Sequence, residues 1–381
     1  MPSASNPTQD ESWMQRAIEL ARRGRGSVEP NPMVGCVIVR HQQILAEGYH
    51  QRFGGPHAEI EALHQLGDAN LHDATVYVTL EPCCHFGKTP PCVDQLIRCR
   101  PERVVIGIQD PFPRVAGGGI QRLREAGIRT EVGVLADEAT RLLEPYLKRV
   151  QLQLPWVHAK WAMSLDGTIA THTGSSQWIS SPESREATLK KRSEMDAIVV
   201  GIGTVLADNP RLTARPSGTR IPTRIIFDSK AILPLTSQLI ATLPEAPVLV
   251  VCGPDASEKN IVALQSHQVE VLQWPSPDPQ LRIESTLREL AKRDFTNILI
   301  EGGSRLLGAF HDGQWIDEAY VVIAPKIIGG HQAYHPIGGH GISQMSQASM
   351  LRDVSFDWIG GDLHLRGRLH RNSKMTSDKS A

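Results

Sequence analysis

The chain has 381 residues, of which 40% are hydrophobic and 21% are charged, a composition typical of soluble globular proteins. This length exceeds what one typical core fills, so we expect two domains. The formal net charge of −1 disfavours nucleic acid as a partner, and no apolar run is long enough to span a membrane.

The first half of the chain alternates predicted strands with predicted helices. Apolar residues at helical spacing predict a helix over residues 12–24, after which Pro30-Asn31-Pro32 interrupts regular structure. After it, strands are predicted at 34–39, 44–49, 74–80, 104–108 and 130–134. One helix is predicted to begin at His57, and others are predicted at 92–99, 120–126 and 138–152. This alternation is typical of a layered α/β sheet.

Two segments of this half carry the ligands of a catalytic metal. His57 and Glu59 stand where one helix begins, while Cys83 and Cys92 flank the next strand-to-helix junction. One imidazole and two thiolates leave the fourth position of a tetrahedral zinc open for water. A free carboxylate can then move protons. The pattern resembles the general zinc-deaminase signature, except that eight residues rather than two separate the cysteines.

The second half predicts a further α/β domain with its own sheet. Strands are expected at 156–163, 197–200, 224–228, 248–252, 297–300 and 319–323, and helices at 183–194, 281–292 and 304–310. With a boundary near Leu154-Pro155, the first domain covers residues 1–150 and the second covers 151–371. The polar segment 372–381 is expected to be a disordered tail.

One junction in this half is suited to an anionic ligand. A β-branched strand runs through Glu301 into Gly302-Gly303, and a helix starts with Ser304, so backbone N–H groups can approach a phosphate closely. An ordinary strand-to-helix turn explains the same segment equally well. The pattern Gly201-Ile202-Gly203 lacks the third glycine of a dinucleotide fingerprint and carries little weight.

The cysteines and the N-terminal segment indicate the cellular compartment. Six cysteines in a chain of this length do not make a disulfide framework, and thiolate metal ligands persist in a reducing environment. Residues 1–10 are polar and lack the apolar segment of a secretory signal. We therefore expect a cytoplasmic protein.

The whole chain resembles the RibD family, the bacterial riboflavin biosynthesis enzymes in which a pyrimidine deaminase is fused to a reductase. The matching segments of the first half are PNPMVGCVIV (30–39), GGPHAEIEAL (54–63), TLEPCCHFGKTPPC (79–92) and QDPFPRVAGGGI (109–120). Those of the second half are KWAMSLDGTIA (160–170), GSSQWISS (174–181), GIGTVLADNPRLTAR (201–215), IFDS (226–229), EGGSRLLGAF (301–310) and IAPKIIGG (323–330). The long loop between the cysteines is the most specific of them.

The resemblance implies a fold and two consecutive reactions. The fold is a cytidine-deaminase-like three-layer α/β/α domain followed by a dihydrofolate-reductase-like α/β domain. The first reaction replaces the 2-amino group of 2,5-diamino-6-ribosylamino-4(3H)-pyrimidinone 5′-phosphate by oxygen, with one Zn²⁺ per chain. The second reduces the ribosyl side chain to ribityl with NADPH. The partners are thus a small pyrimidine ribosyl phosphate and, in this family, a second copy of the chain in a dimer.

The resemblance also implies roles for individual residues. His57, Cys83 and Cys92 would bind zinc, and Glu59 would carry protons. The positions that match substrate contacts are Asn31 and Lys88 in the first half and Ser176, Arg192, Leu212, Arg215 and Glu301 in the second. The positions that match NADP contacts are Ala162, Trp178, Thr204, Asp208, Ser229, Gly303, Ser304, Arg305, Leu306 and Leu307.

Three other functions compete with this interpretation. A nucleoside or tRNA deaminase with an unrelated second domain shares the zinc chemistry, but it favours Cys-x-x-Cys and, for a nucleic acid, a basic surface. A purely structural zinc site has no need of Glu59 and normally has a fourth protein ligand. A reductase with a decayed deaminase half would not keep the complete set of His57, Glu59, Cys83 and Cys92.

Overall fold

The computed structural model describes residues 8–67, 70–86, 90–214, 220–331 and 333–369. The chain divides into two compact units, Met1–Gln153 and Leu154–Ala381, each built on its own sheet. Lys88, Arg215 and the tail predicted at 372–381 lie outside the described residues. No helix in the described part of the chain is both long and apolar enough to cross a bilayer.

The first unit contains a five-stranded sheet with the order β2-β1-β3-β4-β5. Its strands are β1 (Gly35–Arg40), β2 (Gln43–Tyr49), β3 (Ala74–Leu80), β4 (Arg103–Ile108) and β5 (Arg129–Val132). Its helices are α1 (Gln9–Ala21), η1 (Arg22–Gly24), α2 (Ala58–His64), α3 (Cys92–Cys99), α4 (Gly118–Glu125) and α5 (Ala136–Leu152). β1 pairs antiparallel with β2 and β3, whereas β3, β4 and β5 run parallel.

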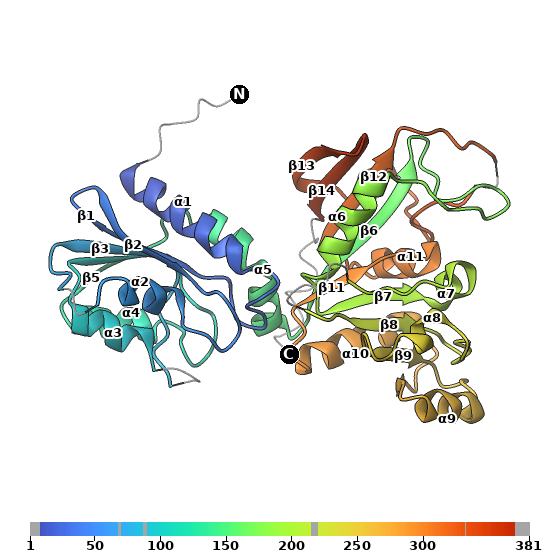
Figure 1. Ribbon diagram of the computed structural model, residues 1–381, viewed down its shortest axis with the longest axis horizontal. Helices are drawn as coiled ribbons and strands as arrows, with labels where there is room; N and C mark the ends of the chain where they lie inside the picture. The colour runs from blue at the N-terminus through green and yellow to red at the C-terminus, as the bar shows by residue number, and fades with distance from the viewer. Residues whose placement is uncertain (1–7, 68–69, 87–89, 215–219, 332, 370–381) are drawn as a thin grey trace. The chain divides into compact units, whose positions relative to one another are not determined.

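Helices cover both faces of this sheet, so the first unit has three layers (Figure 1). Side chains alternate between the faces along each strand, as the twofold period of a strand requires. On β1, Cys36 and Ile38 pack with α2, α3 and α4, while Val37 and Val39 pack with α1 and α5. The helices of the first face, α2 and α3, begin at His57 and Cys92, and this places two predicted ligands at one end of the sheet.

The second unit contains a nine-stranded sheet with the order β10-β9-β8-β7-β11-β6-β12-β14-β13. Its strands are β6 (Trp156–Ser164), β7 (Ala197–Gly201), β8 (Thr223–Phe227), β9 (Val248–Cys252), β10 (Glu270–Gln273), β11 (Asn297–Ile300), β12 (Glu318–Ala324), β13 (Leu351–Ile359) and β14 (Asp362–Leu369). Its helices are α6 (Pro182–Arg192), α7 (Ile202–Asp208), α8 (Gln238–Ala241), α9 (Glu258–Ser266), α10 (Pro279–Lys292), α11 (Ser304–Asp312) and η2 (Met345–Gln347).

The seven strands from β10 to β12 run parallel to one another. β14 pairs antiparallel with both β12 and β13. Two apolar clusters fill its faces. One packs α10 and α11 against the sheet, and the other packs α7, α8 and α9 against the opposite face. Because parallel strands direct their carboxyl ends to one edge, the loops after β6, β7, β8, β9 and β11 share that edge, where α/β sheets bind ligands.

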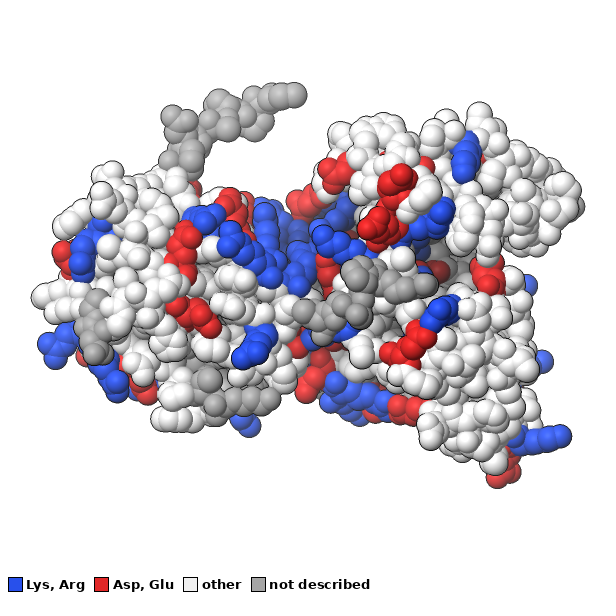
Figure 2. Space-filling model, viewed as in Figure 1, with Lys and Arg blue, Asp and Glu red and all other residues white. Residues whose placement is uncertain are grey.

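The sequence predictions were most accurate for buried, continuous apolar strands and failed for exposed or short elements. β3, β9 and β11 are confirmed to the residue. The unpredicted elements are α7, α8, α9, β10, β13 and β14. Acidic and basic side chains are interspersed over the visible surface of each unit (Figure 2), in agreement with the formal net charge of −1.

Candidate functional site

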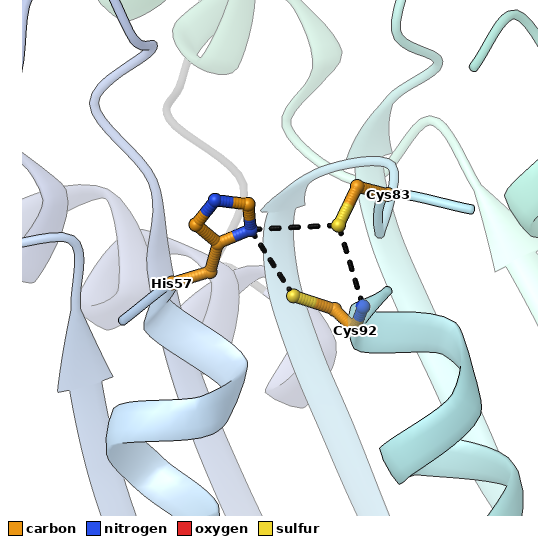
Figure 3. Close-up of side chains that lie close together, drawn as sticks. All are labelled: His57, Cys83 and Cys92. Carbon is orange, nitrogen blue, oxygen red and sulfur yellow. Dashed lines mark hydrogen bonds between the residues drawn. The ribbon is translucent and has the colours of Figure 1, made fainter. Parts of the chain in front are cut away.

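The structure brings His57, Cys83 and Cys92 together. Nδ1 of His57 lies 3.2 Å from Sγ of Cys92 and 3.5 Å from Sγ of Cys83, and all three donor atoms are within 4.8 Å of one another. The ring and the two thiols point toward a common centre (Figure 3). The backbone N–H of Cys92 donates to Sγ of Cys83 at 3.3 Å, which fixes the second thiol against the start of α3.

The chemistry of this donor set fits zinc. Tetrahedral Zn²⁺ accepts imidazole nitrogen and thiolate sulfur, and three protein ligands leave one position for water. A hydrogen bond from Cys92, together with neighbouring His57, holds the pKa of Cys83 well below its usual range, so this residue is a thiolate at neutral pH. Within the described residues, no other three His, Cys, Asp or Glu side chains form such a cluster.

Glu59 lies beside this cluster in the first turn of α2, where its side chain is only 3% exposed. Burial raises the pKa of Glu59 to about 7, although His57 opposes the shift. A carboxyl group with a pKa near the working pH can both accept and donate protons, and a bound cation would favour its carboxylate form. The environment of Glu59 therefore suits a proton carrier.

His50 connects Asn31 to this site and was missed by the sequence analysis. The carbonyl oxygen of Pro56 lies 2.8 Å from Nδ1 of His50 and can only accept, so Nδ1 carries the proton. Nε2 then accepts from the Asn31 side-chain amide at 3.1 Å. The His50 ring also packs edge-on against His57, with centroids 5.4 Å apart. A lone histidine in sequence carries no signal of such a role.

Glu81 is a second residue that the sequence analysis did not identify. It directly precedes Pro82-Cys83, and its buried carboxylate accepts four backbone N–H groups at 2.9 to 3.1 Å. The donors belong to Asp110, Gly117, Gly119 and Ile120. Glu81 thereby ties the segment that carries Cys83 to the loop that precedes α4.

In the second unit, several predicted substrate residues meet at the carboxyl edge of the sheet. Arg192, at the end of α6, donates two hydrogen bonds of 2.7 Å to the carboxylate of Glu301, which follows β11. It also donates to the carbonyl of Thr213 at 3.1 Å. Lys160 on β6 is half-buried close to this pair, and desolvation lowers its pKa although Glu301 opposes the shift. Ser176 donates to Asp208 at 3.3 Å.

The predicted NADP positions lie along the same edge. Gly302 and Gly303 have positive φ of 120° and 81°, a backbone conformation that favours glycine, and they lead into α11. A Cβ on Gly303 would lie 3.1 Å from Oγ1 of Thr204, so the turns after β7 and β11 are neighbours. Ser229 follows β8, Ala162 lies near the end of β6, and Leu306 and Leu307 are buried on α11. These positions therefore follow one another along the carboxyl edge of the sheet.

Trp178, another predicted NADP position, differs from the rest because it is largely exposed. The guanidinium carbon of Arg185 lies 4.4 Å from the centroid of its ring. Lys326 donates to the carbonyls of Trp178 and Ile179 at 2.9 and 2.7 Å. The backbone at Trp178 is thus fixed while one face of its ring is covered by a cation.

Comparison with protein families gives a match for each unit. Residues 7–108 match the cytidine and deoxycytidylate deaminase zinc-binding region, and residues 155–365 match the RibD C-terminal domain. The riboflavin biosynthesis protein RibD of Actinobacillus pleuropneumoniae is 42% identical over 367 residues, which cover 96% of this chain and 97% of that relative. The chain belongs to the RibD family.

Other relatives give the same result. Escherichia coli RibD is 38% identical over 374 residues, covering 94% of this chain and 100% of that protein. The solved structure of Acinetobacter baumannii RibD in form 1 has a TM-score of 0.82 and 36% identity, covering 95% of this chain and 99% of that one. A Thermotoga maritima diaminohydroxyphosphoribosylaminopyrimidine deaminase/5-amino-6-(5-phosphoribosylamino)uracil reductase has a TM-score of 0.80, 36% identity and the same coverage.

These relationships confirm the fold class and the general function expected from the sequence. The first unit is a cytidine-deaminase-like domain and the second is a RibD-type reductase domain. The protein is a bifunctional enzyme of riboflavin biosynthesis, a zinc-dependent deaminase joined to an NADPH-dependent reductase that acts on a small molecule.

Proposed function

We propose that residues 1–150 remove the 2-amino group of 2,5-diamino-6-ribosylamino-4(3H)-pyrimidinone 5′-phosphate, and that residues 151–371 then reduce the ribosyl side chain to ribityl. The observation that carries this proposal is the cluster of His57, Cys83 and Cys92 beside buried Glu59. The names of the two activities of the Thermotoga relative support the order of substrates. Free cysteines throughout the chain support a reducing, cytoplasmic location.

In the deaminase step, the residues of this chain divide into ligands, a proton carrier and supports. Zinc bound by His57, Cys83 and Cys92 supplies the Lewis acidity that lets water add to the ring at neutral pH. Glu59 accepts a proton from the attacking water and delivers it to a ring nitrogen. It then takes the remaining proton from the added hydroxyl group and gives it to the amino group, which leaves as ammonia. Asn31, oriented by His50, contacts the pyrimidine, and Lys88 is proposed as a further contact.

In the reductase step, the protein mainly aligns the two reactants. Ala162, Trp178, Thr204, Asp208 and Ser229, with the Gly303–Leu307 turn, hold NADPH along the carboxyl edge of the sheet. Ser176, Arg192, Leu212, Arg215 and Glu301 hold the substrate. Since hydride transfer depends on the alignment of the nicotinamide with the sugar carbon, these contacts contribute orientation and electrostatics.

A substrate panel tests the deaminase assignment against the nucleoside-deaminase alternative. Purified enzyme is incubated with the diaminopyrimidinone phosphate, cytidine or deoxycytidine monophosphate, and ammonia release is followed. We expect release from the first compound only. Release from the nucleoside or nucleotide, with none from the diaminopyrimidinone phosphate, would contradict the proposed substrate.

We also propose that the enzyme is a homodimer joined through β13. This strand lies at the edge of the nine-stranded sheet and alternates polar residues with Val354, Phe356 and Trp358, the last two 67% and 70% exposed. Edge strands with apolar side chains favour pairing with another strand. Phe356→Glu should convert the dimer to a monomer in light-scattering measurements of molar mass. An unchanged mass for that variant, or a monomeric natural enzyme, would contradict this interface.

A further inference from the structure

A buried arginine without a partner lies at the carboxyl edge of the second sheet. Arg282 is near the start of α10 and is 7% exposed. Among the described residues, its guanidinium forms no hydrogen bond or ion pair, and its nitrogens are not among the fully buried polar atoms, so solvent can reach them. It acts electrostatically on Cys252, but burial raises the pKa of that thiol, so the neighbour stays neutral. Five N–H donors are thus held in place with no acceptor.

The surrounding chain fixes Arg282 in this position. A Cβ on Gly253, directly after β9, would overlap Nη1 of Arg282, so the missing side chain makes room for the guanidinium against the turn. On α10, the carbonyl of Arg282 accepts from Thr286 at 2.7 Å, and Thr286 accepts from the indole of Trp274 at 3.0 Å. Gln273 donates to the carbonyl of Gly253 at 3.3 Å. Hydrogen bonds therefore hold both Arg282 and the turn at Gly253 in place.

This arrangement is electrostatically unfavourable unless an anion binds. The first turns of a helix carry partial positive charge, which disfavours a cation, and a largely buried guanidinium loses part of its hydration without gaining a protein acceptor. The carboxyl group of Asp228, directly after β8, accepts from the backbone N–H of Leu233 through Oδ2, and its buried Oδ1 has no hydrogen-bond partner and does not pair with Arg282. An oxyanion between α10 and the turn after β9 would relieve both costs and could accept two parallel hydrogen bonds from the guanidinium.

The position of the arginine indicates which anion binds. The backbone N–H of Gly253 donates to the carbonyl of Ser229 at 3.0 Å, and Ser229 is a proposed NADP contact. The sheet order β9-β8-β7-β11 places this site on the far side of β8 from the Gly302-Gly303 turn. A dinucleotide whose pyrophosphate lies at that turn would extend across β7 and bring its adenosine end to β8 and β9.

We propose that Arg282 binds the 2′-phosphate of NADPH and so makes the reductase select NADPH over NADH. This role rests on the NADPH site proposed above and adds the guanidinium that would bind the 2′-phosphate. Ser229 and the turn at Gly253 provide the other walls of the site. The 2′-phosphate is the only chemical difference between the two cofactors, so one buried guanidinium that pairs with it can set the preference.

Calorimetric binding of adenosine 2′,5′-bisphosphate and of 5′-AMP tests this role directly. These probes differ only in the 2′-phosphate. The natural enzyme should prefer the bisphosphate, and Arg282→Gln should reduce that preference at least about tenfold while binding 5′-AMP unchanged. The matched control is Arg288→Gln on the same helix, an exposed residue paired with Glu284, which should keep the preference. The KM for NADPH should rise in parallel in Arg282→Gln.

The outcomes separate this proposal from the assignment of NADPH itself. If the natural enzyme prefers the bisphosphate and Arg282→Gln keeps the same preference, the role of Arg282 is wrong while the cofactor site stands. If the natural enzyme does not prefer the bisphosphate, both are wrong. Should Arg282→Gln fail to fold, Gly253→Ala provides the same test, because the added methyl group displaces the guanidinium and should also lower the preference.

Discussion

At the scale of single residues, the surroundings of Glu59 account for its proposed chemistry better than its position in a motif does. It is buried beside two thiols and an imidazole, and burial raises its pKa toward neutrality. An exposed carboxyl group would have a pKa near 4 and would return a proton poorly at neutral pH. The fold supplies this burial by placing Glu59 in the first turn of α2, two residues after the N-cap residue His57.

Replacing Glu59 by Gln should therefore separate metal binding from catalysis. Because Glu59 is outside the cluster of three ligands, zinc content should be unchanged, while deamination should fall about 100-fold or more. Reduction of the deaminated intermediate should continue. Metal analysis and ammonia release check both expectations, and Cys83→Ser serves as the contrast because it should lose metal and activity together. Undiminished ammonia release by Glu59→Gln would rule out this proton carrier.

The residues that sequence reasoning found and missed differ in a physical way. His57, Cys83 and Cys92 could be found because metal ligands require particular residue types, and these three stand at strand-to-helix junctions. His50 and Glu81 could not, since their roles depend on contacts with Asn31 and with the loop before α4, which only the folded chain brings close. Arg282 is similar: a single arginine in an amphipathic helix resembles a solvated residue until its burial is known.

At the scale of elements, Glu81 explains how the zinc-ligand segment is held. The carboxylate replaces the hydrogen bonds that the loop backbone would otherwise make with water, and each of its oxygens accepts two N–H groups. The segment after β3 cannot shift without breaking several of these bonds. The position of Cys83 thus depends on the carboxylate of Glu81, two residues earlier in the sequence.

Glu81→Gln should weaken the first unit. An amide nitrogen in place of one oxygen would face two N–H donors, so two hydrogen bonds are lost and buried donors are left without acceptors. We expect the free energy of unfolding of this unit to fall by about 2–4 kcal/mol, with a drop in deaminase activity. Denaturant unfolding measures the change, and Glu125→Gln on the exposed surface of α4 is the control. Equal stability of the two variants would show that Glu81 is dispensable.

Strands that are buried on both faces were predicted more accurately than strands whose side chains are exposed. β9 and β11 are continuous apolar strands between two helical layers, and they were predicted to the residue. β13 was missed because most of its side chains are exposed and its polar residues alternate with Val354, Phe356 and Trp358 without an apolar face to bury within the chain. Local sequence alone does not distinguish such an exposed strand from a loop.

At the scale of the whole molecule, a buried network joins β6, β12 and β14 of the second unit. Glu318 lies 2.7 Å from His158 and also pairs with Arg366. Burial alone would raise the pKa of Glu318, but His158 and Arg366 hold it well below its usual range. A carboxyl group with a lowered pKa contributes stability above its unfolded pKa of about 4.3, and this contribution is lost as the pH falls toward the folded value.

Glu318→Gln should therefore change how stability depends on pH. Near neutral pH the variant should lose about 2 kcal/mol relative to the natural protein, because His158 loses a hydrogen-bond acceptor and Arg366 loses its ionic partner. The difference should shrink steadily below about pH 4, where the carboxyl group becomes protonated in the unfolded chain while it stays ionised in the folded one. Thermal or denaturant unfolding at several pH values measures it, with Glu284→Gln as control, a partly exposed residue on α10 that, among the described residues, pairs only with Arg288 of the same helix. A difference that stays constant on acidification would mean that ionised Glu318 is not the source of the stability.

The central claim is that one chain performs two reactions in a fixed order, and mass spectrometry of the products tests it most directly. The diaminopyrimidinone phosphate is incubated with zinc-loaded enzyme, with and without NADPH. The account predicts exchange of the amino group for oxygen in both samples, and addition of two hydrogens only where NADPH is present. Reduction that precedes deamination, or an unchanged substrate in both samples with zinc bound, would contradict it.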